Sequence, residues 1–375
     1  MKSKVCFVVS NAMTVNSFLL EPIMLLSKVY DVYIVLNVES NSPLQKLDNV
    51  AKIIPINIQR KISLRSDFLA LWQLFKLFRQ YKFQIVHSVT PKAGLLAMLA
   101  SFFSGIGVRV HTFTGQVWAT KTGVKRWVFK KIDFLIGLLA TNILVDSFSQ
   151  RQFLISEKVI SDNKSSVLAQ GSIAGVNVHR FKPNLIIRSK IRRELNVSEG
   201  HIIILFLGRL NFDKGVLDLA NAFNNLENNN AHLLFVGPDE GNIKSQILKI
   251  IDKSSDRVHF VEFTDSPESY MAAADLLCLP SYREGFGSVI IEAAAVGIPA
   301  VGSRIYGVVD AISEYESGLL FTPRNVPELQ NCLNRLTVDT DYRIELGKQA
   351  FDRVQKYFTS ESVATSWLNY YQAKL

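Results

Sequence analysis

The chain has 375 residues, enough for about two domains of ordinary size, so we expect two compact halves with a cleft between them. Its composition, 48% hydrophobic and 20% charged, excludes a disordered, collagen-like or coiled-coil protein. The formal net charge of +9 is uneven: residues 1–190 hold 25 Lys+Arg against 9 Asp+Glu, and residues 191–375 hold 17 against 24. We therefore expect the first half, and not the second, to meet an anionic partner.

The sequence carries no sign of a secreted or membrane-spanning protein. The three cysteines have no metal-like spacing, which argues against a disulfide framework and a structural zinc site. Near the start, only the short run 5–9 is apolar, too brief for the core of a signal peptide. The charge-poor stretch within 93–108 is shorter than a membrane span. We therefore expect a cytoplasmic protein without a transmembrane anchor.

Short apolar runs alternate with helix-length stretches along the whole chain, a pattern typical of βαβ units around parallel sheets. We therefore predict an α/β fold with two Rossmann-like, doubly wound domains. The predicted strands of the first domain are residues 5–9, 32–36, 53–56, 84–87, 108–112 and 143–145.

A segment with glycines and a proline, 171–184, precedes a charged helix predicted at 187–194, so we place the domain boundary there. The first domain then spans residues 1–184 and the second spans 185–359. Amphipathic helices are predicted from 341 onward, and the last of them, 360–375, fits either domain. The predicted strands of the second domain are residues 202–207, 233–236, 258–261, 276–279, 300–301 and 319–321.

The most informative stretch is LPSYREGFGSVIIEAAAVGIPAVGSR at 279–304, a predicted strand end followed by a glycine-containing turn and a helix. Glu292 is the only charged residue between Glu284 and Arg304. A carboxylate in so apolar a helix is costly unless it accepts hydrogen bonds, and the hydroxyls of a ribose would supply them. The alternative for Glu292 is a buried ion pair.

Two features could hold a phosphate. The first is the loop after the predicted strand 202–207, where Gly208 is followed by Arg209 and Lys214 before a helix begins. Two cations at the carboxyl end of a strand suit a diphosphate on which charge grows as a sugar leaves; the alternative is a solvated surface pair. The second is the turn that opens the helix, because free backbone N–H groups favour a phosphate or a sugar oxygen. It comprises Gly285, Phe286 and Gly287.

The pair Glu284 and Glu292, set in LPSYREGFG and followed by GIPAVGS, resembles the EX7E motif of retaining glycosyltransferases of family 4, in particular those that build bacterial surface polysaccharides. The resemblance implies the GT-B fold, in which two Rossmann-like domains face each other across a cleft. It also implies that Glu292 binds the ribose of a sugar nucleotide and that Glu284 contacts the donor sugar. The amides of Phe286 and Gly287 would then meet the donor sugar or phosphate, while Arg209 and Lys214 hold the diphosphate.

In the first domain, residues 84–94 resemble the family's DIVH…TPKAG segment, which implies that Thr90 and Lys92 face the cleft. For Lys92 a mobile surface lysine fits equally well. Residues 110–118 follow another strand, where many relatives place a histidine beside the sugar in T-x-H-G. This chain has Thr114 at the position of that histidine. The candidates that line the cleft on the acceptor side are therefore Thr112, Thr114 and Gly115. His111 is a weaker candidate, because a histidine among apolar neighbours is usually a core residue.

Two basic segments of the first half interleave cations with aromatic side chains, as helices that lie on an anionic surface do. The first is residues 60–83, which include Arg60 and Lys61; the second is 121–131. The alternative is that the aromatic residues are core and the charges are solvated. We expect an anionic membrane surface and a polyprenyl-diphosphate-linked glycan as partners, with the protein peripheral on the inner face of the cytoplasmic membrane. The cations of the second segment that we expect to contact the membrane surface are Lys125, Arg126, Lys130 and Lys131.

No metal site and no cofactor is predicted. Residues 339–341 formally match the D-x-D of metal-dependent transferases of another fold, but they lie in a polar turn between helices with no strand before them. Neither a Walker loop nor a Rossmann G-x-G-x-x-G is present. No module that recognises nucleic acid accompanies the basic half either, so we expect no nucleic-acid partner.

The sequence therefore predicts a retaining, metal-independent glycosyltransferase. It would move a hexose or N-acetylhexosamine from a nucleoside diphosphate, such as UDP, to a hydroxyl of a lipid-linked glycan in O-antigen or capsule biosynthesis. Two alternatives remain. A nonhydrolysing sugar-nucleotide epimerase has the same architecture, and a noncatalytic protein that binds anionic surfaces would explain the basic half.

Overall fold

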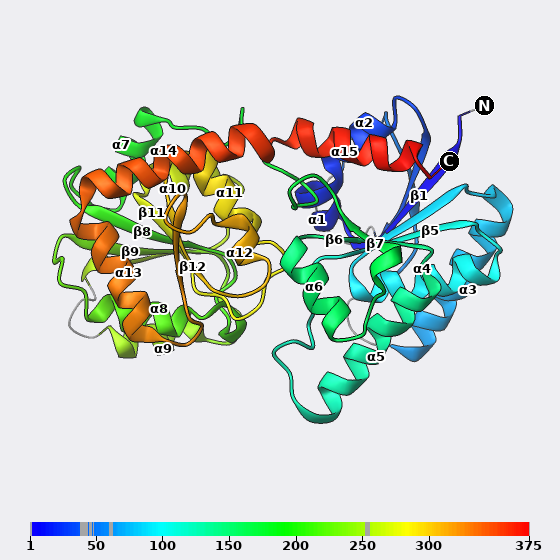
Figure 1. The fold of residues 1–375 in the computed structure, drawn as a ribbon, viewed down its shortest axis with the longest axis horizontal. Helices are drawn as coiled ribbons and strands as arrows, with labels where there is room; N and C mark the ends of the chain where they lie inside the picture. Colours follow the sequence, from blue (N-terminus) through cyan, green and yellow to red (C-terminus); the bar gives the residue numbers. More distant parts are fainter. Residues whose placement is uncertain are drawn as a thin grey trace. The chain divides into compact units, whose positions relative to one another are not determined.

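The structure of the protein is a computed structural model, which describes residues 2–37, 44, 47, 49–59, 63–251 and 256–374. It forms two compact units: the first comprises Met1–Gly175 and Ser360–Leu375, and the second comprises Val176–Thr359. Each unit has a parallel sheet covered by helices on both faces (Figure 1). This is the predicted α/β class with two doubly wound domains.

In the described residues, the sheet of the first unit has seven strands in the order β3-β2-β1-β4-β5-β6-β7. Val5 in the first strand pairs with Val32 on one side and with Ile85 on the other, so the order reverses between β1 and β4. The carboxyl ends of these two strands form the topological switch point of the sheet. The strands are β1 (Lys4–Asn11), β2 (Asp31–Asn37), β3 (Lys52–Pro55), β4 (Ile85–Val89), β5 (Val108–Phe113), β6 (Asn142–Val145) and β7 (Ser165–Val167).

Alternate residues of the buried strands face opposite layers of helices, because successive side chains of a strand point to opposite faces. In β1, Cys6 and Val8 join the core under one layer, and Val5, Phe7 and Val9 join the core under the other. The first layer holds α3 (Leu64–Tyr81), α4 (Pro91–Phe103), α5 (Gly123–Leu139) and α6 (Phe148–Ser156); the second holds α1 (Ala12–Thr14), the π-helical turn Val15–Leu19, α2 (Leu20–Leu26) and α15 (Ser360–Gln372).

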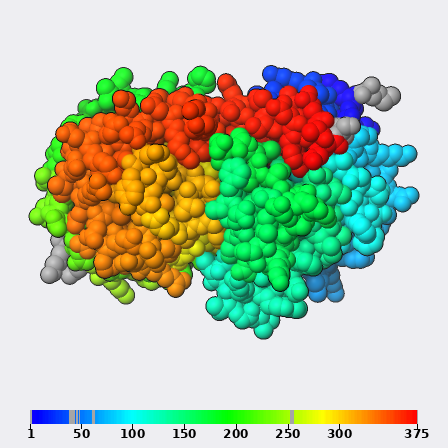
Figure 2. Space-filling view, in the orientation of Figure 1, coloured from blue at the N-terminus to red at the C-terminus, as the bar shows by residue number. Residues whose placement is uncertain are grey.

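The last helix, α15, belongs to the first unit, although the sequence left its domain open. Its Trp367 indole Nε1 donates to the Ile173 carbonyl at 2.9 Å. The Tyr371 hydroxyl lies 2.6 Å from His87 Nδ1 in β4, and the Tyr371 and Trp367 side chains are fully buried. Figures 1 and 2 show this red C-terminal helix beside the blue α2 near the start of the chain.

Apart from residues 252–255, which the structure does not describe, the sheet of the second unit has six parallel strands in the order β10-β9-β8-β11-β12-β13. Every predicted strand of both domains overlaps an observed one, and β7 alone was not predicted. The strands are β8 (Ile202–Leu207), β9 (Ala231–Val236), β10 (Val258–Val261), β11 (Leu276–Leu279), β12 (Ala300–Ser303) and β13 (Gly318–Phe321). The helices are α7 (Leu185–Glu194), α8 (Val216–Asn224), α9 (Ile243–Ile250), α10 (Pro267–Ala273), α11 (Ser288–Ala295), α12 (Val308–Ala311), α13 (Val326–Val338) and α14 (Thr340–Tyr357).

The units divide at Gly175/Val176, earlier than the expected boundary at 184/185. The physical reason is that the segment 176–184 packs on the second unit. The Val176 amide donates to the Phe358 carbonyl at 2.7 Å, and Phe181 is buried in the second core. The chain therefore enters and leaves the second unit at hydrogen-bonded neighbours.

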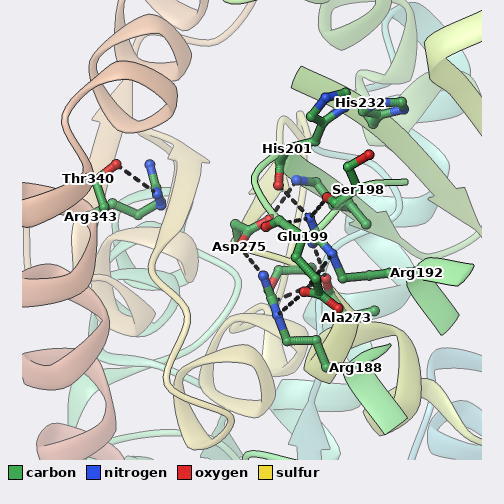
Figure 3. Close-up of polar contacts among 12 residues, drawn as sticks. Arg188, Arg192, Ser198, Glu199, His201, His232, Ala273, Asp275, Thr340 and Arg343 are labelled. Carbon is green, nitrogen blue, oxygen red and sulfur yellow. Dashed lines mark hydrogen bonds and ion pairs between the residues drawn. The ribbon is translucent and has the colours of Figure 1, made fainter. Parts of the chain in front are cut away.

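The helix after this segment, α7, is fixed to the second unit by a buried ion-pair network (Figure 3). Asp275, which precedes β11, accepts from Arg188 Nη2 at 2.7 Å and from Arg192 Nη1 at 3.2 Å. The Arg192 side chain is fully buried and also donates to backbone carbonyls, including that of Ala273 at 3.0 Å. A buried guanidinium requires such pairing, and its Nε lies 3.4 Å from Glu199 Oε2 without a hydrogen bond. Of the helices in the described part of the chain, none combines the length and the apolar character needed to cross a bilayer.

Candidate functional site

The candidate donor site lies at the topological switch point of the second sheet. There β8 pairs with β11, while β9 and β10 extend to one side and β12 and β13 to the other. In open α/β sheets, ligands bind outside the carboxyl ends of the strands at this point. The loops that follow the two strands, 208–215 and 280–287, carry all the predicted phosphate and sugar contacts except Glu292.

Polar contacts join these two loops. Lys214 Nζ lies 2.5 Å from Glu284 Oε1, and Arg283 Nη2 lies 3.1 Å from Asp213 Oδ2. Gly215 has φ +64°, and a Cβ placed on it would lie 2.0 Å from the Pro280 carbonyl oxygen, so only glycine permits this approach. Asp213 and Arg283 were not predicted, although each adjoins a predicted residue in the sequence.

The turn before α11 is arranged as the sequence predicts. Gly287 is the N-cap residue, with φ +86°, and no side chain caps the helix. The Phe286 ring is buried and packs on Phe358, with ring centroids 5.5 Å apart, which anchors the turn to the core. The N-terminal amides of an uncapped helix can therefore donate to an anionic or electron-rich ligand.

Glu292 lies in the second turn of α11, and its side chain is partly buried. Burial raises its pKa to about 7, while nearby Arg180 lowers that pKa and Glu268 raises it. Arg180 pairs with Glu268 at 2.9 Å. Among the described residues none forms an ion pair with Glu292 or donates a hydrogen bond to it, so the alternative of a buried ion pair has no support here. The carboxyl can accept hydrogen bonds from a ligand.

Arg209, the other predicted cation, has a carboxylate partner that the sequence analysis missed. Its Nη1 lies 3.0 Å from both oxygens of Glu240, and Asn211 Nδ2 donates to the same carboxylate at 3.1 Å. Glu240 lies in the loop after β9, the strand next to β8. A charged residue in a Pro-Asp-Glu-Gly turn directly after a strand is a signal that could have identified it.

In the first unit, Thr90 lies directly at the switch point. Its Oγ1 is 2.6 Å from Ser10 Oγ, so the ends of β4 and β1 are joined there by hydroxyls. Thr90 has φ +77°, which is unusual for a β-branched residue. Lys92 follows in the first turn of α4 and pairs with Asp67 at 2.6 Å.

The remaining candidates of the first unit divide into two groups. Thr114 and Gly115 follow β5 and are partly exposed at the carboxyl edge of the sheet. Thr112 and His111 are buried within β5, where Thr112 Oγ1 lies 2.7 Å from His87 Nε2 and His111 Nδ1 lies 2.8 Å from Ser88 Oγ. Burial lowers the pKa of His111 to about 3, so this imidazole is neutral at physiological pH. Its position is that of a core residue.

The basic segments of the first unit are partly core and partly exposed. Arg60 and Lys61 lie outside the described residues. In α5, Arg126 and Lys130 both contact Glu157, at 3.0 Å and 2.6 Å, so two of the four cations predicted to face a membrane are paired. Large apolar side chains are nevertheless exposed along α3, α4 and α5; they include Leu64, Phe68, Trp72, Phe102, Phe103, Val124 and Trp127.

The described residues contain no group of three or more His, Cys, Asp or Glu side chains placed to hold a metal ion. The aspartates of the formal D-x-D match lie at the start of α14. There Asp339 is the N-cap residue and accepts a hydrogen bond from the Tyr342 amide at 3.0 Å. This capping role accounts for an aspartate at this position.

Two family models match the chain, one in each unit. The model for glycosyl transferases group 1 matches residues 187–353, and the model for glycosyl transferase 4-like proteins matches residues 4–147. Among curated proteins, the capsular polysaccharide biosynthesis glycosyltransferase CapM of Staphylococcus aureus is 28% identical over 342 residues, which cover 90% of this chain and 88% of CapM.

A second relative is the UDP-Gal:alpha-D-GlcNAc-diphosphoundecaprenol alpha-1,3-galactosyltransferase of Escherichia coli, 25% identical over 78% of this chain and 76% of that protein. Among solved structures, Anabaena Alr3699/HepE in complex with UDP and glucose superimposes with a TM-score of 0.83 at 17% identity, over 99% of this chain and 100% of that one. That likeness concerns the fold, and it agrees with the GT-B architecture. The two family models together match most of the residues of both units, and both models describe glycosyl transferases.

Proposed function

We propose that the protein transfers a sugar from a nucleoside diphosphate to a hydroxyl of a lipid-linked glycan, with retention of the anomeric configuration. The observation that carries this proposal is that Arg209 and Lys214 follow β8, that Glu284 follows the neighbouring β11, and that Lys214 and Glu284 are in contact at the switch point of the second sheet. The second unit is then the donor side of the enzyme, and the first unit is the acceptor side.

The residues of the second unit can divide the work on the donor. Arg209 and Lys214 would bind the diphosphate, together with the amides of Phe286 and Gly287. Glu292 would accept hydrogen bonds from the ribose hydroxyls. Its pKa of about 7 allows the ionised form to be present at physiological pH, and a ligand that donates hydrogen bonds stabilises that form.

In the transfer step, the bond between the anomeric carbon and the β-phosphate oxygen breaks as the acceptor oxygen bonds to that carbon from the same face. The acceptor proton passes to an oxygen of the leaving diphosphate, so no enzyme nucleophile is needed. Negative charge grows on the diphosphate, and fixed cations lower the barrier by stabilising it. Glu284 would orient the donor sugar, and the two cations would do this work without a metal ion.

We further propose a polyprenyl-diphosphate-linked glycan as the acceptor, in the biosynthesis of a bacterial surface polysaccharide. The printed names of two relatives support this: CapM acts in capsular polysaccharide biosynthesis, and the Escherichia coli enzyme acts on a GlcNAc-diphosphoundecaprenol. UDP is the nucleotide in that second name, which favours a UDP-sugar for this chain. A hexose and an N-acetylhexosamine are both compatible with the proposal.

A lipid-linked acceptor requires the protein to reach a membrane surface, and the first unit has a face suited to it. The helices α3, α4 and α5 lie side by side. Phe68 and Trp127 are 68% and 62% exposed, and Lys76 Nζ lies 3.5 Å from the Trp72 ring centroid. Exposed aromatic and basic side chains together favour peripheral binding to an anionic bilayer, such as the inner face of the cytoplasmic membrane.

A donor screen tests the proposal against its alternatives. The purified protein is incubated with UDP-hexoses and UDP-N-acetylhexosamines, with and without a lipid extract, and the products are analysed by NMR. We expect free UDP and a glycosylated lipid only when the extract is present. An epimerised donor would indicate a sugar-nucleotide epimerase, and binding to anionic vesicles without any turnover would indicate a noncatalytic protein.

A further inference from the structure

Glu240, a carboxylate outside the motif, forms an ion pair with Arg209, one of the two cations assigned to the diphosphate. Both oxygens of Glu240 lie 3.0 Å from Arg209 Nη1, and Asn211 supports the same carboxylate. The Arg209 and Glu240 side chains are 42% and 43% exposed. An ion pair this accessible to solvent is weak enough for a ligand to replace one partner.

The fold places Glu240 beside Arg209. The Leu210 amide donates to the Pro238 carbonyl at 2.8 Å, and the Glu240 amide donates to the Leu210 carbonyl at 2.9 Å. The loops after β8 and β9 therefore continue the pairing of the two strands, which keeps their side chains close together.

The neighbouring carboxylate, Asp239, has a different role. Its Oδ1 accepts a hydrogen bond from the Ile243 amide at 2.8 Å, and its Oδ2 accepts one from the Lys244 amide at 3.2 Å, at the start of α9. Two adjacent acidic residues are thus used differently: Asp239 stabilises the start of a helix, and Glu240 contacts the cation of the donor site.

We propose that Glu240 is a positioning residue that holds Arg209 in the empty enzyme and competes with the diphosphate for it. This inference rests on the proposed function, in which Arg209 binds the diphosphate. Carboxylate and phosphate accept the same forked hydrogen bonds from a guanidinium, so one arginine can exchange between them. When the donor binds, its diphosphate replaces Glu240 at Arg209. After transfer, Glu240 pairs with Arg209 again, and this weakens the binding of the nucleoside diphosphate that remains.

The pair between Lys214 and Glu284 differs in one respect. Glu284 belongs to the motif and has an assigned task at the donor sugar, so replacing it would remove a sugar contact as well as the ion pair. Glu240 has no such task, and its removal should therefore affect the binding of the diphosphate without removing a sugar contact. This difference makes Glu240 the informative residue to change.

The test compares UDP binding to the wild type, Glu240→Gln and Glu345→Gln by isothermal titration calorimetry at low salt. Glu345 is a matched control because it is exposed on α14 of the same unit and its side chain contacts Gln349, not a cation. We expect Glu240→Gln to lower the Kd for UDP about fivefold, the upper range for an exposed ion pair. Glu345→Gln should leave the Kd unchanged.

A second comparison places the same change in an Arg209→Gln background, where Glu240→Gln should have no effect on the Kd. An unchanged or raised Kd for Glu240→Gln would overturn the inference, and so would an equal decrease without Arg209, which would indicate only a general charge effect. Melting temperatures verify that the variants fold, and Glu240→Ala provides a second substitution. If the wild type bound no nucleoside diphosphate at all, the proposed function itself would fail.

Discussion

Lys214 Nζ and Glu284 Oε1 lie 2.5 Å apart, and this ion pair joins the loop after β8 to the loop after β11. The two side chains are 21% and 15% exposed, so the pair is partly shielded from water. A cation for the diphosphate and a carboxylate for the sugar are thus brought together before any ligand arrives. Such preorganisation reduces the free energy needed to arrange charges during the reaction.

Replacing the lysine of this pair should reduce turnover much more than stability. We expect Lys214→Ala to lower kcat by on the order of 10²-fold or more, because the charge that develops on the leaving diphosphate loses a fixed cation. Lys348→Ala, which removes an exposed cation of α14, serves as the control and should retain wild-type kcat. A Lys214→Ala variant with normal kcat would remove this residue from the site.

Donor affinity should rise with pH through about 7. The reason is that the pKa of Glu292 is raised to about 7, and the ionised carboxylate is the form that accepts hydrogen bonds from the ribose. As the pH falls below 7, the carboxyl becomes protonated and binding weakens. Calorimetric titration with UDP-glucose from pH 5.5 to pH 8.5 measures this change in affinity. The range extends more than about one pH unit to either side of the pKa of Glu292.

The variant Glu292→Gln is the control for that titration. It should bind the donor weakly at every pH and show no rise near 7, while its melting temperature changes little. A folded Glu292→Gln variant with unchanged donor affinity would contradict the assignment of Glu292 to the ribose.

The buried network around α7 should carry more stability than an exposed ion pair of similar geometry. We expect Asp275→Ala to destabilise the protein by about 3–5 kcal/mol, because it leaves the buried guanidinium of Arg192 with only the exposed Glu199 as its counter-charge. Glu314→Ala removes the partner of the half-exposed Arg304 and should cost less than about 1 kcal/mol. Urea unfolding of the two variants compares them; equal losses of stability would contradict the structural role of the network.

Binding to anionic vesicles should depend on both charge and exposed aromatic residues of α3 and α5. We expect the protein to sediment with phosphatidylglycerol vesicles at low salt and less at high salt, since the Debye length falls from about 10 Å at 0.1 M to about 3 Å at 1 M. Lys125→Glu with Lys131→Glu should weaken binding, and so should Trp127→Ser.

The same experiment has two controls. Lys348→Glu on the second unit should not weaken sedimentation, and neutral vesicles should not bind the protein. Arg126 and Lys130 already pair with Glu157, so we expect less from changing them. Equal binding to neutral vesicles would contradict the role of charge, and an absence of binding to anionic vesicles would favour a soluble acceptor.

Much of the fold could be predicted from the sequence because buried parallel strands appear as short apolar runs. The strand β7 was missed because Ser165 and Ser166 leave Val167 as its one apolar residue. The domain boundary was placed late because glycine and proline mark an irregular segment but not the unit on which it packs; Phe181 packs on the second core.

The candidate site was predictable only where the functional residues adjoin a recognisable motif. Glu240 was missed because its proximity to Arg209 depends on the pairing of β8 with β9, which brings together residues 31 positions apart. The pairing of Arg126 with Glu157 likewise spans 31 positions. Thr112 was expected to line the cleft, but its side chain is buried and its Oγ1 lies 2.7 Å from His87 Nε2, a contact that depends on the pairing of β4 with β5.

The most direct measurement is the transfer of a radiolabelled sugar from UDP-sugars to a synthetic polyprenyl-diphosphate-linked glycan, with the wild type, Lys214→Ala and Lys348→Ala assayed side by side. We predict labelled lipid with the wild type and with Lys348→Ala, little with Lys214→Ala, and an α linkage from an α-linked donor. Absence of labelled lipid with every donor, or product formation that does not depend on Lys214, would contradict the proposed transfer reaction.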